Sequence, residues 1–329
     1  MSQFRYNKLT QHWVLFAPNR AKKPTNFKDD SEVKRNIESC PFESGNESKT
    51  PKELLRIGDD KSWRCRIVPN LYNALNIEDE AKSFKRGCFE NRSGFGAHEV
   101  IVETPSHRLQ MFDFDIDHFF DYFSIIKLRI EDLKKDIRLK YFSIFKNHGQ
   151  DSGASLEHSH SQLIATPFIP KSVDDDLKRF KEYKEKTDRY FFDDMIHDEL
   201  NYKEGILFEN SSFISYCPYA SRFPFEVNIV SKKESLRSII DFDDTDIYSL
   251  SNICNKVFQA LKKALGDVSF NMIVKNGAVQ DKENQNRFHI LILPRIYKIA
   301  GFELDTDIMI NTFLPSTASK ILKNSLKDS

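Results

Sequence analysis

The chain has 329 residues, which is enough for two domains of ordinary size. Apolar residues make up 40% and charged residues 30% of a chain with zero formal net charge, so composition describes a globular protein without an overall attraction to nucleic acid. No apolar run is long enough to cross a membrane, and the N-terminus lacks the apolar core of a signal peptide. Five scattered cysteines without a C-x-x-C pair favour reduced thiols, so we expect a cytoplasmic protein with no membrane contact.

The first hundred residues predict short strands separated by polar loops. A strand is expected at about residues 12–17, and a basic loop carrying Arg20 and Lys23 follows it. Such a loop can meet phosphate, although on its own it more often is simply solvated. Cys40 and Glu43 have the spacing of half a metal knuckle, which is a weak signal by itself.

The next hundred residues alternate between strand and helix patterns. Strand patterns occur at residues 64–68 and 99–104, and apolar residues recur at helical spacing over 114–139. Two apolar runs at 141–146 and 160–166 predict a pair of strands, and 171–190 predict a charged helix.

Between the paired strands lies a motif of the form G-x-S-x-x-H-x-H-x-Q, which covers residues 153–162. Alternate residues of an extended chain face the same side, so His158, His160 and Gln162 would form one polar row. One imidazole could attack phosphorus while the glutamine binds phosphoryl oxygens and the other imidazole binds a metal or orients its neighbour. Two such histidines can equally be a solvated pair or a structural metal site, but the small residues upstream favour phosphate chemistry.

The second part of the chain repeats the first weakly. Glu99 and Glu226 are 127 residues apart, and His160 and His289 are 129 apart, with other matched residues at similar offsets. A nearly constant offset predicts an α+β fold of two tandem halves, each with antiparallel strands and a packed helix. We expect a catalytic N-terminal domain at 1–170 and a degenerate C-terminal domain at 171–329. Arg287 and Leu291 stand where the first half has His158 and Gln162, so His289 is expected to be structural or to contact substrate.

The motifs resemble those of the galactose-1-phosphate uridylyltransferase family, within the histidine-triad superfamily. The resemblance runs nearly end to end, and its most specific part is Ser155-x-x-His158-x-His160-x-Gln162. It implies two histidine-triad-like halves and a homodimer. It also places matching segments along the rest of the chain, namely residues 4–14, 19–24, 40–42, 69–70, 98–100, 223–226 and 300–304.

The resemblance implies a role for individual residues. His160 matches the nucleophile, Gln162 the residue that holds the nucleotidyl-histidine intermediate, and Ser155 the contact to phosphate. The remaining substrate contacts are matched by Gly153 and Ala154 at the phosphate, Asn70 and Asn147 at the nucleotide, Arg20 and Lys23 on the basic side, and Lys298 and Glu303 at the hexose.

The resemblance also implies one structural zinc site, formed by Cys40, Glu43, His107 and His158. Glu43 stands where the family usually has a second cysteine, and a carboxylate can ligate zinc or a harder metal. Some relatives carry a second zinc site, whose positions here are Tyr190, Asp193, Glu234 and Arg287. Arginine does not coordinate metal, so we expect no second metal.

The implied reaction is ping-pong uridylyl transfer from UDP-glucose to galactose-1-phosphate or another hexose-1-phosphate, through a uridylyl-His160 intermediate, as part of galactose metabolism. The same residues would serve an ADP-glucose phosphorylase or a dinucleoside-tetraphosphate phosphorylase, in which phosphate is the acceptor. A third alternative, from a different class, is a non-catalytic nucleotide-binding protein. Intact Ser155, His160 and Gln162 argue against it.

Overall fold

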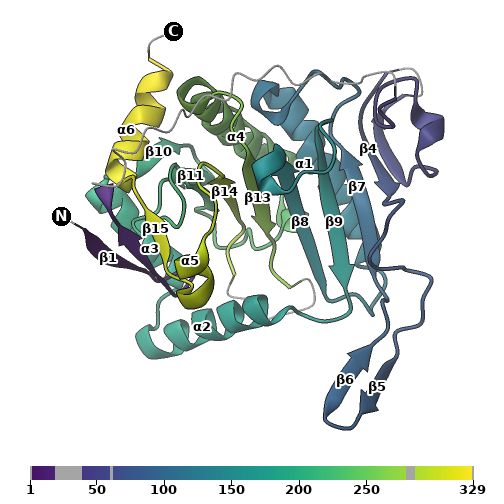
Figure 1. The fold of residues 1–329 in the computed structure, drawn as a ribbon, viewed down its shortest axis with the longest axis horizontal. Helices are drawn as coiled ribbons and strands as arrows, with labels where there is room; N and C mark the ends of the chain where they lie inside the picture. The colour runs from purple at the N-terminus through teal and green to yellow at the C-terminus, as the bar shows by residue number, and fades with distance from the viewer. Residues whose placement is uncertain (1, 19–38, 60–61, 279–285, 328–329) are drawn as a thin grey trace.

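A single ten-stranded antiparallel sheet forms the centre of the molecule in the computed structural model, which describes residues 2–18, 39–59, 62–278 and 286–327 (Figure 1). From one edge to the centre the sheet consists of β3 (Leu55–Gly58), β4 (Trp63–Pro69), β7 (Ala97–Val102), β9 (His160–Thr166) and β8 (Tyr141–His148). It continues to the other edge through β13 (Phe270–Lys275), β14 (His289–Pro294), β12 (Val227–Ser231), β11 (Phe213–Tyr216) and β10 (Ile206–Glu209).

The strand order is the same from the centre outward in both directions, which confirms the two related halves predicted from the offset. The halves meet where β8 pairs with β13, and Asn147 lies opposite Asn271 at that seam. The sequence predicted antiparallel sheets in each half. The structure shows that the two sheets are joined into one, because pairing β8 with β13 removes an exposed edge from each half.

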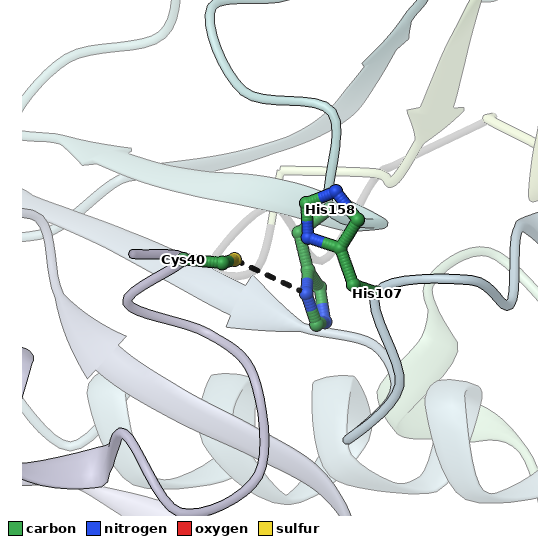
Figure 2. Close-up of side chains that lie close together, drawn as sticks. All are labelled: Cys40, His107 and His158. Atoms are coloured by element: carbon green, nitrogen blue, oxygen red, sulfur yellow. Dashed lines mark hydrogen bonds between the residues drawn. The ribbon is translucent and has the colours of Figure 1, made fainter. Parts of the chain in front are cut away.

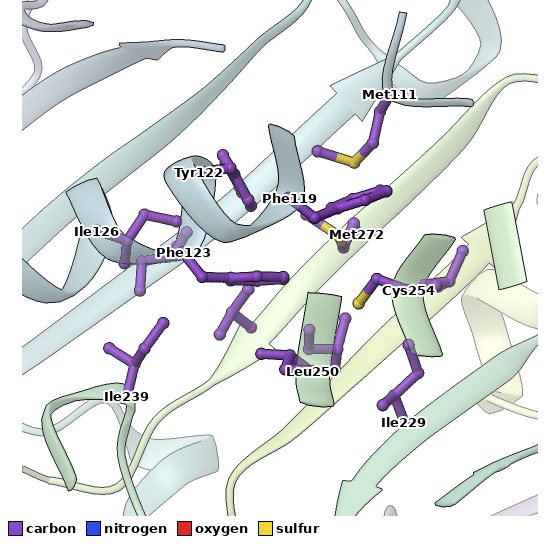
Figure 3. Packing of buried hydrophobic residues seen from close by; sticks show 14 of the residues in the cluster. Met111, Phe119, Tyr122, Phe123, Ile126, Ile229, Ile239, Leu250, Cys254 and Met272 are labelled. Carbon is purple, nitrogen blue, oxygen red and sulfur yellow. The ribbon is translucent and has the colours of Figure 1, made fainter. Parts of the chain in front are cut away.

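The two long helices α1 (Ile116–Leu133) and α4 (Asp244–Leu265) cover one face of the sheet and pack against each other. Each begins at an aspartate whose side chain accepts a backbone N–H, Asp115 in α1 and Asp243 in α4. These caps satisfy orphan donors of the first turn, and each is the last residue of an Asp-Phe-Asp (D-F-D) sequence, at residues 113–115 and 241–243. Figure 3 shows part of the core that the two helices share. In this core the rings of Phe119 and Phe258 are stacked, with 5.6 Å between their centroids.

The helices α2 (Lys171–Thr187) and α3 (Phe191–Tyr202) lie against the other face, over the second half. The sequence predicted one helix over 171–190. The structure ends it at Thr187 because Asp188 adopts a left-handed backbone conformation, φ 57°, and α3 follows as an element that was not predicted. Phe180, Phe191 and Phe192 form a separate apolar cluster there.

The remaining elements lie around the central sheet. A small sheet joins β1 (Gln3–Asn7), β2 (His12–Phe16) and β15 (Met309–Asn311), with the β2–β15 pair parallel, and β5 (Ser83–Arg86) with β6 (Phe89–Arg92) forms a projecting hairpin. The described residues also contain α5 (Gly301–Thr306), α6 (Pro315–Ser325) and short 3-10 turns at Glu47–Lys49, Met111–Asp113, Gln150–Ser152 and Ile239–Asp241. Among the described residues, no helix is both long and apolar enough to span a membrane.

Candidate active site

The motif histidines lie at the start of β9, in the middle of the first half. The strand begins at His160, so His158 lies in the preceding loop rather than in the strand, as the extended reading of the motif assumed. His160 and Gln162 share one face of β9, opposite Val102 and Val100 of β7. The rings of His158 and His160 both contact Phe42, at 5.9 and 5.7 Å between ring centroids, so they lie on the same side of the chain.

The ring of His160 is held in one orientation. Its Nδ1 lies 2.7 Å from the carbonyl oxygen of His158, so Nδ1 carries the proton and donates to that oxygen. Burial, and after it the charge of Lys146, lower the pKa of the His160 imidazole, so the ring is neutral at pH 7. A neutral ring protonated at Nδ1 leaves the lone pair of Nε2 free to act as a nucleophile.

Gln162 is oriented by His98 of β7. The Nδ1 atom of His98 accepts the backbone N–H of Ala74 at 3.0 Å, so the proton of this ring is on Nε2. That Nε2–H donates to Oε1 of Gln162 at 2.8 Å. With its oxygen engaged, Gln162 keeps its amide N–H groups for an anion. His98 was not among the site residues predicted from the sequence, although its alternation with Val100 and Val102 places it on this face.

Asn70 lies at the same place, at the end of β4. Its side-chain nitrogen is 3.0 Å from Nε2 of His98, and its side-chain oxygen accepts the backbone N–H of Tyr72. The structure therefore brings Asn70, His98 and Gln162 into one contiguous set. These three residues come from three neighbouring strands, which is the arrangement that a sheet-based binding site requires.

The glycine turn between β8 and β9 is closed by its own hydrogen bonds. The N–H of Gly153 donates to the carbonyl oxygen of Gln150 at 3.1 Å, and the N–H of Ala154 donates to that of Gly149 at 3.3 Å. Gly153 has φ 84°, a left-handed conformation that glycine adopts at low cost. Ser155 is exposed. The backbone donors of Gly153 and Ala154 are thus engaged within the turn, whereas the exposed Ser155 offers its hydroxyl to solvent.

The other predicted contacts lie at the seam and beyond it. The side-chain oxygen of Asn147 accepts from the Asn271 amide at 2.8 Å, and the same amide bonds the carbonyl oxygen of Ser152. Lys298 is exposed and lies 3.6 Å from Asp151 Oδ1, next to the glycine turn. Glu303 lies in α5 and accepts the backbone N–H of Ala300. Arg20 and Lys23 lie outside the described residues.

Three predicted metal ligands come together beside His160. Cys40, His107 and His158 are buried and offer ligand atoms that lie within 4.8 Å of one another. Figure 2 shows the three side chains gathered at one place. Cys40 Sγ is 3.4 Å from His158 Nδ1, and both ring nitrogens of His107 are buried without a hydrogen-bond partner. Unpaired buried nitrogens cost free energy, so a bound cation would satisfy them.

Glu43 completes the set of predicted ligands. One of its carboxylate oxygens lies 3.9 Å from His158 Nδ1 and accepts the backbone N–H of His107 at 2.6 Å. Nε2 of His158 donates to the carbonyl oxygen of Thr104, which directs the Nδ1 lone pair toward Cys40 and Glu43. Burial lowers the pKa of His158 to about 4 and raises the pKa of the Cys40 thiol. A neutral imidazole pair with a thiol and a carboxylate fits a borderline-soft cation such as zinc.

The second half has the same backbone geometry without the same chemistry. His289 lies opposite Val230 of β12, as His160 lies opposite Val102, and its Nδ1 bonds the carbonyl oxygen of Arg287 at 2.7 Å. Arg287 Nη2 forms an ion pair with Asp193 of α3 at 2.7 Å. The ring of Phe192 lies 5.4 Å from the His289 ring. In this half, α3 therefore covers the position that corresponds to the nucleophile.

Comparison with known proteins agrees with this fold and site. Residues 1–170 match the family model described as galactose-1-phosphate uridyl transferase, N-terminal domain, and residues 112–329 match a domain of unknown function. ADP-glucose phosphorylase of Arabidopsis thaliana is 32% identical, over 98% of this chain and 92% of that protein. Galactose-1-phosphate uridylyltransferase of Thermotoga maritima is 25% identical, over 98% of each chain.

A solved structure is similar over the whole chain. The crystal structure of ADP-glucose phosphorylase from Arabidopsis thaliana with bound ADP-glucose superimposes with a TM-score of 0.83 at 30% identity, covering 98% of this chain and 99% of that one. The chain therefore belongs to the galactose-1-phosphate uridylyltransferase family of nucleotidyltransferases. This confirms the family resemblance read from the motif.

Proposed function

We propose that the protein transfers an adenylyl group from ADP-glucose to inorganic phosphate through a covalent adenylyl-His160 intermediate. The observation that carries the covalent step is the fixed Nδ1–H of His160, which leaves a nucleophilic Nε2 beside the oriented amide of Gln162. The choice of ADP-glucose and phosphate is supported by end-to-end similarity to an ADP-glucose phosphorylase. The resemblance read from the sequence favoured uridylyl transfer, which remains the second candidate below.

In the first half-reaction, Nε2 of His160 attacks the α-phosphorus of the donor. A P–N bond forms, the bond to the bridging oxygen breaks, and glucose-1-phosphate leaves. In the second half-reaction, an oxygen of inorganic phosphate attacks the same phosphorus, the P–N bond breaks, and ADP leaves. The P–O and P–N bonds that are exchanged in both steps are similar in energy. The main contributions of the protein are therefore the positioning of the reacting groups and the stabilisation of charge.

Gln162 and Ser155 are proposed to bind the transferred phosphoryl group. The Gln162 amide is already oriented by His98, and the exposed Ser155 hydroxyl lies five residues before His160. A cation at this site would have four protein ligands, namely Cys40, Glu43, His107 and His158. Because four protein ligands leave no open coordination position, the cation would fix the loop before β9 rather than bind substrate. Asn70 and Asn147 are proposed nucleotide contacts, with Gly153 and Ala154 shaping the phosphate turn.

The second candidate is uridylyl transfer from UDP-glucose to galactose-1-phosphate or another hexose-1-phosphate. It is favoured by the match of residues 1–170 to the uridyl transferase family model. Lys298, beside the glycine turn, and Glu303 would then contact the hexose phosphate. A homodimer is expected from the resemblance and a cytoplasmic location from the scattered cysteines, and sedimentation velocity would measure the oligomeric state.

The intact mass of the protein, after mixing with ADP-glucose or with UDP-glucose, tests both candidates. An adenylyl adduct that forms with ADP-glucose and disappears on adding phosphate supports the phosphorylase. A uridylyl adduct that disappears on adding galactose-1-phosphate, and not phosphate, would replace it with the transferase. The His160→Ala variant is the control and must form neither adduct. No adduct with either donor would overturn covalent catalysis and favour a nucleotide-binding protein.

A further inference from the structure

Directly behind the nucleophile, on the helix side of the sheet, lies a fully buried ion pair. Lys146 Nζ of β8 is 2.7 Å from Glu103 Oε2, and the exposed fractions of the two side chains are 1% and 0%. Burial disfavours the charge of Glu103, but Lys146 and two hydroxyl donors lower the carboxyl pKa below its usual value. The pair is therefore charged in a region where charges are costly.

The side chains of this pair form hydrogen bonds to Ser159, His160 and Ser161, around the start of the strand that carries the nucleophile. Lys146 also donates to Ser159 Oγ at 3.0 Å and to the carbonyl oxygen of His160 at 3.2 Å. Glu103 accepts the hydroxyls of Ser159 and Ser161, the residues on either side of His160. The N–H of Glu103 donates to the carbonyl oxygen of Ser159. Five hydrogen bonds thus converge on three consecutive residues of the chain.

The second half provides an internal comparison, because its strands pair in the same way. His289 corresponds to His160, so the positions of Ser159 and Ser161 are taken by Phe288 and Ile290. Gln162 lies opposite Phe145, and Leu291 lies opposite Ile273, so Val274 takes the position of Lys146. Three of the network positions are thus apolar there, and all three residues are buried.

The same fold is therefore built without the ion pair in the half that has lost the polar row. Replacing a buried pair by apolar residues of similar volume is commonly neutral for stability, whereas removing one partner is strongly destabilising. Folding alone consequently does not explain why the first half keeps two charges and two hydroxyls beneath His160. A requirement for a fixed backbone at the nucleophile does explain it, because an error of about 1 Å in position can slow a reaction about 100-fold.

We infer that Glu103 and Lys146 are positioning residues that hold residues 159–161 so that His160 is aligned for attack on the nucleotide phosphorus. The inference rests on the proposed function. Neither side chain reaches the face of the sheet on which His160 and Gln162 lie, so their hydrogen bonds hold His160 through the backbone and the two serines.

The decisive variant is Glu103→Leu/Lys146→Met, which removes both charges together. We expect it to fold with a melting temperature close to that of the parent protein. The rate of nucleotidylation of His160 at saturating ADP-glucose, measured by rapid quench and intact mass, should fall about 30-fold or more, while the half-saturating concentration changes little. A rate within about threefold of the parent in the folded double variant would overturn the inference.

A matched control lies in the second half. Asp193→Leu/Arg287→Met removes an ion pair whose arginine is 2% exposed and occupies the position of His158. This control should change the rate by less than about twofold. If the Glu103→Leu/Lys146→Met protein does not fold, Ser159→Ala/Ser161→Ala removes only two hydroxyls and should still slow nucleotidylation about tenfold. An unchanged rate in the serine variant would count against the inference.

The tautomer of His160 gives a readout that does not depend on turnover. Imidazole ¹⁵N shifts, assigned by comparison with His160→Ala, should show one neutral tautomer protonated at Nδ1 in the parent protein. They should show a mixture in the serine variant, because the His158 carbonyl is no longer held in place. A single unchanged tautomer would overturn the inference even if the parent forms an adduct. Absence of an adduct in the parent, with the tautomer change present, would instead overturn the proposed function alone.

Discussion

The Nε2–H of His98 donates to Oε1 of Gln162 at 2.8 Å, across the β7–β9 pair. This contact fixes which end of the glutamine amide faces the substrate. Because Nδ1 of His98 accepts the Ala74 N–H, the proton of the ring is on Nε2 and the oxygen of the Gln162 amide faces it. The orientation of Gln162 therefore depends on a histidine two strands away from the seam.

We predict that His98→Phe keeps the fold and slows nucleotidylation of His160 by about tenfold, because Gln162 loses the donor that orients it. His98→Asn, whose amide can still donate to Gln162, should recover part of the rate. The measurement is the adduct formation rate at saturating donor. Equal rates for the parent and the phenylalanine variant would show that Gln162 needs no such support.

The metal site gives a second prediction. The purified protein should contain about one equivalent of zinc by elemental analysis, held by Cys40, Glu43, His107 and His158. Chelation should lower the melting temperature, because the unpaired nitrogens of His107 and the loop before β9 lose their common partner.

Variants of Glu43 test whether it is a ligand. Glu43→Cys should raise zinc affinity, since thiolate is the softer ligand, and Glu43→Gln should lower it by about 10- to 100-fold. Competition with a chromophoric chelator measures both. A Glu43→Gln protein with the affinity of the parent would limit the role of Glu43 to its hydrogen bond with the His107 backbone.

The sequence predicted the catalytic half more fully than the arrangement around it. The repeat offset predicted the symmetric strand order, because related halves pair their strands alike, and the D-F-D pattern marked both helix starts. It did not predict that β8 and β13 would pair, since no local pattern specifies which edges meet. It missed α3, whose apolar Phe191 and Phe192 follow directly on a long charged helix.

Within the candidate site, the motif pointed to His160 and Gln162 but not to the residues that hold them. His98, Glu103 and Lys146 act through contacts between strands, and such contacts depend on register. The expected free backbone donors of Gly153 and Ala154 are engaged within the turn, because a left-handed glycine closes that turn on itself. A single sequence does not show which donors a turn consumes.

A third prediction concerns pH. Burial raises the pKa of Glu226 from 4.5 to about 7, although its carboxyl accepts the backbone N–H groups of Arg222 and Phe223. Between about pH 4.5 and pH 7, Glu226 therefore stays protonated in the folded protein, whereas in the unfolded chain it has lost its proton. The resulting stability is fully present below about pH 4.5 and is lost as pH rises through about 7, a change of about 3 kcal/mol.

The Glu226→Gln variant isolates this effect, because glutamine accepts the same N–H groups and does not titrate. The free energy of unfolding of the parent minus that of the variant should fall by about 3 kcal/mol between pH 4.5 and pH 8. Chemical denaturation at each pH provides the values. A pH-independent difference would mean that Glu226 has an ordinary pKa in the folded protein.

The last prediction concerns the division into residues 1–170 and 171–329. Phe258 of α4, in the second part, stacks on Phe119 of α1, in the first, and both rings are buried in the core that the two parts share. We predict that Phe258→Ala lowers the free energy of unfolding by about 3–5 kcal/mol, because a large ring leaves a cavity.

A probe in the first part of the chain shows whether residues 1–170 and 171–329 unfold independently. Trp63, 3% exposed, reports on the first part of the chain, and Trp13→Phe removes the other tryptophan as background. If the shared core couples the two parts, the Trp63 fluorescence transition of the Phe258→Ala protein shifts by as much as its far-ultraviolet circular dichroism transition. If the parts unfold independently, the Trp63 transition stays where it is while the circular dichroism transition splits. We expect coincident shifts, since ten strands in one sheet and one shared core leave no surface along which the parts can separate without exposing apolar side chains.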